Sequence, residues 1–213
     1  MDLVSFYNIF VIISAASILL PNMGGLIVFK RLDIEGKKIL AFFAIFIIVE
    51  FVITWLGFHK INNMPMFSIF ELLEYGFFAY LFYTNIKELR WKKFIKYASF
   101  FYFTFAIFVL LFIRSIYEFN SETRVVESLL LVLFSLLYFN ELSKALQTEQ
   151  ISINKIPMFW MSIGILFYFM SNFFLFLFYN EISKITPTLW AIHSVVNTAA
   201  NFLFMISFLC RQK

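Results

Sequence analysis

Two carboxylates lie three residues apart inside a segment that is long and apolar enough to cross a bilayer. Glu71 and Glu74 belong to the stretch 65–84, PMFSIFELLEYGFFAYLFYT. This spacing places both side chains on one face of a helix. Because a charged side chain at mid-membrane costs about 2.5–3.5 kcal/mol on insertion scales, such groups normally face a partner or a wet cavity. Glu71 and Glu74 are therefore the first candidates for ligand binding or ion relay.

The composition indicates a membrane protein. Hydrophobic residues make up 62% of the 213-residue chain and charged residues 14%, against about 45–50% and about 25% in soluble domains. A water-soluble fold of this length could not bury so much apolar surface. Phe occurs 33 times and Gly only 6 times. Since small residues bring membrane helices close together, we expect bulky packing with few tight crossings.

Seven apolar segments predict an all-α membrane protein, a seven-transmembrane helix bundle that forms one domain over residues 1–213. The predicted spans are 3–29, 39–58, 65–84, 97–117, 124–142, 157–179 and 189–210. The first segment has no basic region before it and is too long for a signal peptide, so we expect it to stay uncleaved. Pro21 predicts a kink in this first helix.

The distribution of Lys and Arg predicts the orientation. Thirteen of the seventeen basic residues fall in the loops after the first, third and fifth spans or in the tail. Because basic loops stay cytoplasmic, the N-terminus should lie outside and the C-terminus inside the cell. We expect a multi-pass protein of the inner (cytoplasmic) membrane whose main partner is the lipid bilayer. The basic residues are too scattered for nucleic-acid binding, and no nucleic-acid partner is predicted.

With this orientation, the polar side chains of the spans gather in the outer half of the membrane. The candidate ligand-binding residues are Glu50, Glu71, Glu74, Arg114, Asn172, His193 and Asn197. We expect them to line an outward-facing polar pocket for a small molecule or a lipid headgroup, because intramembrane ionisable residues face the bundle interior or water. The alternative interpretation is structural: Arg114 would pair with one carboxylate, and the Asn and His side chains would only hydrogen-bond neighbouring helices.

A second charged pair is predicted to lie at the membrane surface. Arg124 and Glu127 are one turn apart at the predicted start of the fifth span. Residues three apart on a helix can pair, and their place near the membrane boundary favours a wet surface ion pair over a site.

Several chemistries are disfavoured. The single Cys210 excludes an internal disulfide and a Cys-rich metal site. The last span has no Lys for a retinal Schiff base, and two His are too few for a His-rich zinc hydrolase, although Glu71, Glu74 and His193 would suit zinc. No nucleophile turn, Walker loop or dinucleotide fingerprint is present. We therefore predict no catalytic residue, no metal and no cofactor.

Four stretches carry a resemblance to known proteins. They are NMPMFSIFELLEYGFF, FNSETRVVESLLLVLFSLLYF, PMFWMSIGILFYFMSN and WAIHSVVNTAANFLF, at 63–78, 119–139, 157–172 and 190–204. Together they resemble a family of small seven-span proteins of Bacteroidota, some of which resemble the membrane sensor regions that precede histidine kinases. The resemblance implies an inner-membrane location and little more. It implies no catalytic residue, and because we expect no kinase part in this chain, a partner would supply the output.

Four functions remain open on this basis. The first is a sensor-like or regulatory module that binds a small molecule or lipid headgroup outside and is read by a cytoplasmic protein at the basic loops. The second is a proton- or cation-coupled small transporter or channel that uses Glu50, Glu71 and Glu74. The third is a membrane-embedded lipid hydrolase with Glu as acid or base. The fourth is a structural or defence-associated accessory subunit.

Overall fold

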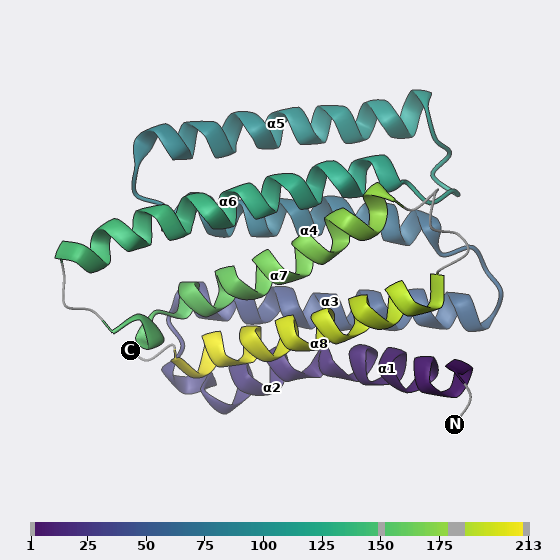
Figure 1. Cartoon of the computed structure of the whole chain (residues 1–213), viewed down its shortest axis with the longest axis horizontal. Coiled ribbons are helices and arrows are strands. Elements are labelled where there is room, and N and C mark those ends of the chain that lie inside the picture. The colour runs from purple at the N-terminus through teal and green to yellow at the C-terminus, as the bar shows by residue number, and fades with distance from the viewer. Residues whose placement is uncertain (1–2, 149–151, 179–185, 211–213) are drawn as a thin grey trace.

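A computed structural model describes the backbone of residues 3–148, 152–178 and 186–210, and within these ranges it contains helices and no strand (Figure 1). The α-helices of the described part are α1 (Leu3–Ser17), α2 (Leu19–Ile27), α3 (Ile34–Phe58), α4 (Met64–Asn85), α5 (Leu89–Phe112), α6 (Ser121–Thr148), α7 (Pro157–Leu177) and α8 (Thr186–Cys210). Two single-turn 3-10 helices, η1 (Phe29–Arg31) and η2 (Ile153–Lys155), lie in connections. The predicted all-α class is confirmed.

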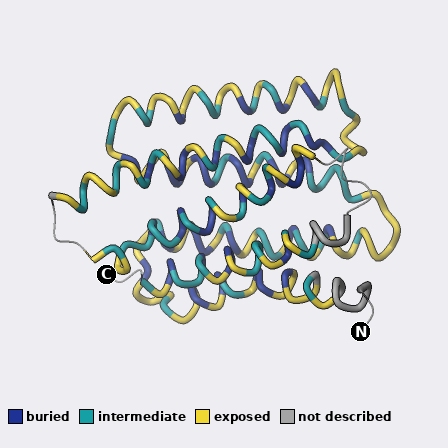
Figure 2. The backbone as a smooth tube through the Cα atoms, viewed as in Figure 1, coloured by how far each residue is buried: buried dark blue, intermediate teal, exposed yellow. Residues whose placement is uncertain are grey.

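Five of these helices contain stretches that are long and apolar enough to cross a membrane. They are Ile34–Phe58, Leu89–Phe112, Ser121–Gln147, Pro157–Leu177 and Ala191–Cys210. The chain is therefore a multi-pass helical membrane protein. Many large apolar side chains on the outer surface are exposed, as expected for residues that face lipid; Phe100 and Phe112 of α5 are examples. Figure 2 shows exposed positions along the outer side of α5 and buried positions on the sides of the helices that face one another.

The first helix breaks where Pro21 predicts a kink. α1 ends at Ser17 and α2 begins at Leu19. Proline has no backbone N–H, so the carbonyl of Ser17, four residues earlier, loses its helical partner. The side-chain amide of Asn22, the residue directly after Pro21, donates to the carbonyl oxygen of Phe43 at 3.1 Å. The short helix α2 is thereby held against α3.

The helices form a ring with α5 outside it. Contacts join α2 to α3, α3 to α4, α4 to α6, α6 to α7, α7 to α8, and α8 back to α1 and α2. α5 lies on the outer side of α4 and α6 (Figure 1). The α7–α8 crossing is close because Gly164 has no side chain: a Cβ there would lie 2.5 Å from Cε1 of Phe204. α2 makes similarly close contacts through Gly24, which packs against Met205 of α8, and through Gly25, which packs against Leu40 of α3.

The interior of the ring is aromatic. Its fully or almost fully buried rings come from five helices and include Phe43, Phe78, Phe82, Phe134, Phe169 and Phe208. Phe78 meets Phe169 edge to face, with 5.7 Å between ring centroids. Offset and edge-to-face pairs of this kind add to the energy of burial. This aromatic core fills the middle of the bundle and separates its two ends.

The two ends differ in charge, and we name them accordingly. The basic end holds η1, the α4–α5 connection and η2, with Lys30, Arg31, Lys37, Lys38, Lys87, Arg90, Lys92, Lys93, Lys96 and Lys155. The opposite end is where α3 and α5 finish and α4 and α6 begin (Figure 1). We call it the cluster end, after the buried ion cluster of α4 and α6 described in the next section. α6 is longer than its predicted span: it starts at Ser121 instead of 124 and continues to Thr148 instead of 142.

Candidate functional site

A buried ion cluster joins α4 and α6 near the cluster end. Nη1 of Arg124 lies 3.0 Å from Oε2 of Glu74 and 3.1 Å from Oε2 of Glu127. Nε of Arg124 lies 3.4 Å from Oε2 of Glu71. The exposed fractions of these residues are 8% for Arg124, 5% for Glu71, 1% for Glu74 and 0% for Glu127. We call these four residues the Arg124 cluster.

Local helix geometry brings the four side chains together. Glu71 and Glu74 share one face of α4, and Arg124 and Glu127 share one face of α6, since residues three apart are neighbours on a helix surface. α6 starts at Ser121, where the side-chain oxygen of Asn120 accepts from the backbone N–H of Thr123 at 3.3 Å. This contact satisfies one of the free N–H groups at a helix start. It places Arg124 one turn inside the helix, within reach of α4.

Tyr102 of α5 completes the contacts of Glu71. Its hydroxyl donates to Oε1 of Glu71 at 3.2 Å, and its side chain is fully buried. Its ring stacks on Tyr75 with 3.9 Å between centroids, and the hydroxyl of Tyr75 donates to Oγ of Ser99 at 3.1 Å. Both oxygens of Glu71 therefore have protein partners, and the outer helix α5 is tied to the cluster.

The cluster carries more negative than positive charge. Three carboxylates share the single guanidinium of Arg124, and the ion pairs of Glu71, Glu74 and Glu127 within the described residues are all with Arg124. Oε1 of Glu127 is buried and accepts no hydrogen bond from the described residues. Removing charges from water costs several kcal/mol per ion unless they are paired. A bound cation or protonation of one carboxylate would relieve this imbalance.

α7 and α8 supply further polar groups on the same side of the ring. The rings of Tyr168 and His193 lie 5.8 Å apart between centroids. Tyr168 is within electrostatic range of Glu74 and Arg124, and the side chain of Asn172 lies close to its hydroxyl. The side-chain oxygen Oδ1 of Asn172 is buried and accepts no hydrogen bond from the described residues. Glu127 of the cluster and Asn172 of α7 therefore each have a buried acceptor oxygen without a donor among the described residues.

The predicted site residues divide between three places. Glu71 and Glu74 belong to the Arg124 cluster, and Glu50 of α3 lies within electrostatic range of Glu74. Asn172 and His193 lie beside it on α7 and α8. Arg114 and Asn197, described next, have other partners.

Arg114 lies outside the cluster, in the connection that follows α5. Its Nη2 is 2.8 Å from Oε1 of Glu122, and the Arg114 side chain is 36% exposed. The alternative in which Arg114 pairs with an intramembrane carboxylate is not what the structure shows, because Arg124 occupies that position. Arg114 and Glu122 instead form an exposed ion pair, a type that contributes about 0–1 kcal/mol.

Asn197 holds α8 against α1. Its side-chain amide donates to Oγ of Ser14 at 2.9 Å, and one turn later Asn201 donates to Oγ of Ser17 at 2.9 Å. Asn201 also lies 3.4 Å from Oδ1 of Asn197. These contacts match the structural alternative for the Asn residues, which is interhelical hydrogen bonding.

The prediction that Arg124 and Glu127 form a surface pair is wrong. Both are buried, and Arg124 is the centre of the ion network. The predicted span began at Arg124, which put that residue at the membrane boundary, whereas the helix begins one turn earlier. A useful signal was present: Glu71 and Glu74 need a buried cation, and Arg124 is spaced three residues from an acidic neighbour. Tyr102 and Tyr168 carried no comparable signal, since the chain has 10 Tyr.

No metal site is evident in the part of the chain that the structure describes, where no three His, Cys, Asp or Glu side chains are grouped suitably. Three cavities lined by described residues lie away from the cluster. One of about 390 Å³ is lined by apolar side chains of α7 and α8 such as Phe174 and Ile192. One of about 170 Å³ lies at the basic end beside Asn85 and Ser207, and one of about 360 Å³ lies between α4 and α5.

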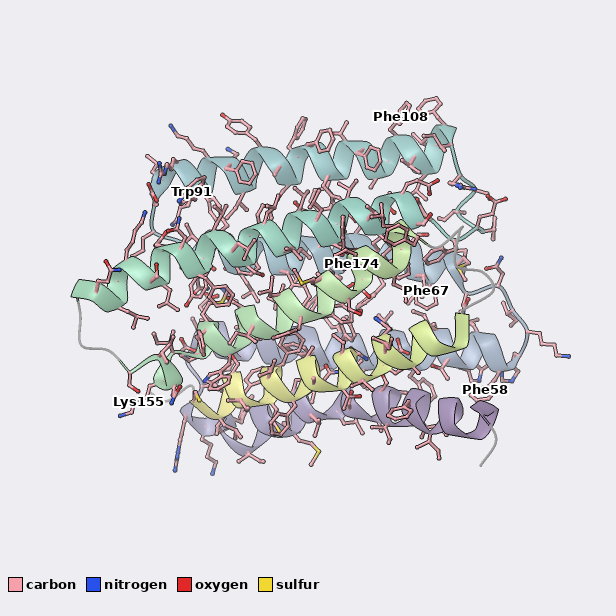
Figure 3. All side chains as sticks on the ribbon, in the orientation of Figure 1. Phe58, Phe67, Trp91, Phe108, Lys155 and Phe174 are labelled. Carbon is pink, nitrogen blue, oxygen red and sulfur yellow. The ribbon has the colours of Figure 1, made fainter. Side chains whose placement is uncertain are left out.

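No family model, no curated protein and no solved structure matches the chain. Functional inference therefore depends on the residues themselves. Figure 3 shows all described side chains on the ribbon; Phe108 points outward from α5, while Lys155 lies at the basic end.

Proposed function

We propose that the protein is a sensor-like or regulatory module of the inner membrane that responds to a small cationic ligand at the Arg124 cluster. The observation that carries this proposal is the sharing of one guanidinium by three buried carboxylates. A buried acidic excess is costly, so it is retained where it has a task. A cation entering the cluster would gain the attraction of Glu127 and the free acceptor oxygens of Glu127 and Asn172.

The proposed topology has seven crossings with the N-terminus outside. In it, α4 and the broken α1–α2 segment cross with the five apolar helices. α4 has 22 residues and is about 33 Å long at 1.5 Å per residue, which matches the hydrocarbon thickness. The cytoplasmic side would be the basic end, since Lys and Arg stay inside. The Arg124 cluster would then lie in the outer half of the membrane.

α6 provides a physical connection between the cluster and the basic end. Arg124 lies near its start, and Glu141, seventeen residues later, lies about 26 Å along the axis. The Glu141 carboxylate accepts from the backbone N–H of Lys87 at 2.6 Å and of Glu88 at 3.2 Å. A shift of α6 caused by a ligand at Arg124 would therefore move the α4–α5 connection. A cytoplasmic partner protein that binds the basic loops would read this movement.

The proposal is tested with the protein in lipid nanodiscs and two matched variants. Thermal unfolding is followed by Trp fluorescence with sodium, ammonium or choline chloride at the same ionic strength. Glu127→Gln removes one negative charge from the cluster, and Glu122→Gln removes one from the exposed pair on the same helix. At ten times its Kd, a bound cation should stabilise the wild type and Glu122→Gln by about 1.4 kcal/mol, and it should not stabilise Glu127→Gln.

Equal salt responses in all three proteins would refute the proposal, because they would reflect screening of surface charge. A second measurement tests whether α6 transmits the effect of the cation from the Arg124 cluster to the basic end. The cation should change amide hydrogen exchange at Lys87 and Glu88 in the wild type and in Glu122→Gln only. Unchanged exchange at these amides would contradict the proposed role of α6.

Transport of a cation or proton is the competing function. The acidic excess would suit it, but a path must also cross the aromatic core formed by rings such as Phe78, Phe134 and Phe169. Polar groups through both halves are expected for a transporter. Proteoliposomes loaded with a pH-sensitive or sodium-sensitive dye separate the two functions: a sensor gives no flux above protein-free liposomes, whereas flux that Glu127→Gln abolishes would favour transport.

A further inference from the structure

A groove runs between α4 and α5 on the outer side of the bundle. It has a volume of about 360 Å³. Its floor is formed by small residues of α4, Gly76 and Ala79, and its opposite wall by Phe103 of α5. A Cβ at Gly76 would lie 3.4 Å from Cζ of Phe103, which is ordinary van der Waals contact. The groove therefore exists because α4 presents small side chains where α5 crosses it.

The groove changes from polar to apolar along its length. Lys96 and Tyr83 line it at the basic end, and Ser99 follows one turn deeper. Gly76 and Phe103 line the part nearer the middle of the bundle. From Lys96 to Phe103 the axis of α5 rises about 10 Å, so the polar and apolar parts are stacked along the membrane normal.

Positive charge gathers at the polar mouth. Lys96 and Lys93 are exposed, and Nζ of Lys92 lies 5.5 Å from the centre of the Tyr83 ring. The guanidinium of Arg90 stacks on Trp91, with 4.4 Å to the ring centroid, and pairs with Glu88. Glu141, the other carboxylate near the α4–α5 connection, accepts hydrogen bonds from the backbone N–H groups of Lys87 and Glu88. Lys92, Lys93 and Lys96 form no ion pair with a described residue, so three positive charges remain at the mouth.

We propose that this groove binds one molecule of an anionic phospholipid. The phosphate and headgroup lie at Lys92 and Lys96, and one acyl chain lies along Gly76, Ala79 and Phe103. The order of basic, hydroxyl and apolar groups along the groove matches the order of groups in such a lipid. Basic pockets between helices on the cytoplasmic side recognise anionic headgroups in this way. This site is separate from the Arg124 cluster and does not depend on the function proposed for it.

The headgroup part of the proposal is tested by lipid retention. The protein is purified in a mild detergent, incubated with phosphatidylglycerol or phosphatidylcholine of equal chain length, and examined by native mass spectrometry. The wild type should retain one phosphatidylglycerol in preference to phosphatidylcholine. Lys96→Gln and Lys92→Gln should each weaken this retention about fivefold, the factor that corresponds to about 1 kcal/mol per basic residue near an anionic surface. Lys37→Gln, an exposed Lys on α3 at the same end, is the control and should retain the wild-type affinity.

The acyl-chain part is tested without changing charge. Gly76→Leu should fill the apolar part of the groove and reduce phosphatidylglycerol retention at least tenfold, whereas Gly76→Ala should keep it. Trp fluorescence melting of both variants checks that the bundle is folded. Wild-type retention by Lys96→Gln, by Lys92→Gln or by Gly76→Leu would overturn the proposal, and so would equal retention of the zwitterionic lipid by the unmodified protein.

Discussion

Nη1 of Arg124 lies 3.0 Å from Oε2 of Glu74, and this contact joins helices whose residues are 50 positions apart in the chain. Because α6 and α4 are adjacent members of the ring, the ion pair lies inside the bundle and not on its lipid-facing surface. The stability lost when one partner of this ion pair is removed depends on whether the other charge stays buried and unpaired. A buried pair broken on one side leaves an unpaired charge, which is far more costly than losing both charges.

Arg124→Gln should therefore destabilise the protein strongly. The substitution leaves three buried carboxylates without a cation, and we expect a loss of about 3–5 kcal/mol in the free energy of unfolding. Unfolding by increasing SDS in mixed micelles measures this loss. Arg114→Gln, which removes the exposed pair with Glu122, is the control and should cost about 0–1 kcal/mol. Equal effects of the two substitutions would show that the cluster is solvated and not buried.

Glu127→Gln, in contrast to Arg124→Gln, should stabilise the protein slightly or leave its stability unchanged. It lowers the number of carboxylates around Arg124 from three to two while keeping the shape of the side chain. Glu74 and Glu127 each accept a hydrogen bond from Nη1 of Arg124 through Oε2, but Oε1 of Glu127 is in addition buried without a donor among the described residues. Glu74→Gln should therefore cost more than Glu127→Gln, about 1.5–3 kcal/mol, the range for hydrogen bonds to charged groups. The same SDS titration compares the two variants. A larger loss for Glu127→Gln than for Glu74→Gln would contradict the imbalance described above.

Glu141→Ala should release the α4–α5 connection from α6. The backbone N–H groups of Lys87 and Glu88 lose their acceptor, so their hydrogen exchange should accelerate at least tenfold. Ser143→Ala on the same helix removes only an exposed bond to the carbonyl of Asn140 and serves as control. Mass spectrometry of peptides covering 86–96 gives the rates. Slow exchange in Glu141→Ala would mean that the connection is held by other contacts.

Gly164→Ala should disturb the α7–α8 crossing. The new Cβ would lie 2.5 Å from Phe204 Cε1 and 3.2 Å from the carbonyl of Ala200, so the helices must shift. Overpacking of this kind costs about 1–3 kcal/mol. Adding Phe204→Leu should recover part of the loss, whereas Gly76→Ala alone should be close to neutral because its nearest contact is 3.4 Å. Thermal unfolding in nanodiscs checks all three, and an additive double mutant would exclude a direct clash.

Asn201→Ala should have a small effect. The residue donates one buried hydrogen bond to Ser17, and such interhelical bonds average about 0.6 kcal/mol in membrane proteins. The SDS titration used for Arg124→Gln should place its loss well below that of the cluster variant. A loss of several kcal/mol would show that the α1–α8 contact depends on this one amide.

The sequence by itself determined the helical membrane class and the positions of most helices. Both follow from local properties: long apolar runs cannot be satisfied in water, and Pro21 removes a helical hydrogen bond wherever the helix lies. The carboxylates Glu71 and Glu74 were also recognisable, because a charge in an apolar run is costly in any arrangement. Only the tertiary structure decided which cation they meet. Arg114 and Arg124 are both basic residues near helix ends, and their roles depend on whether the helix starts early enough to point the side chain inward. Which of the two Arg side chains meets the carboxylates depends on which helices become neighbours in the ring. The same holds for the contact of Asn197 with Ser14 across 183 positions. Periodicity along one helix carries no information about its neighbour.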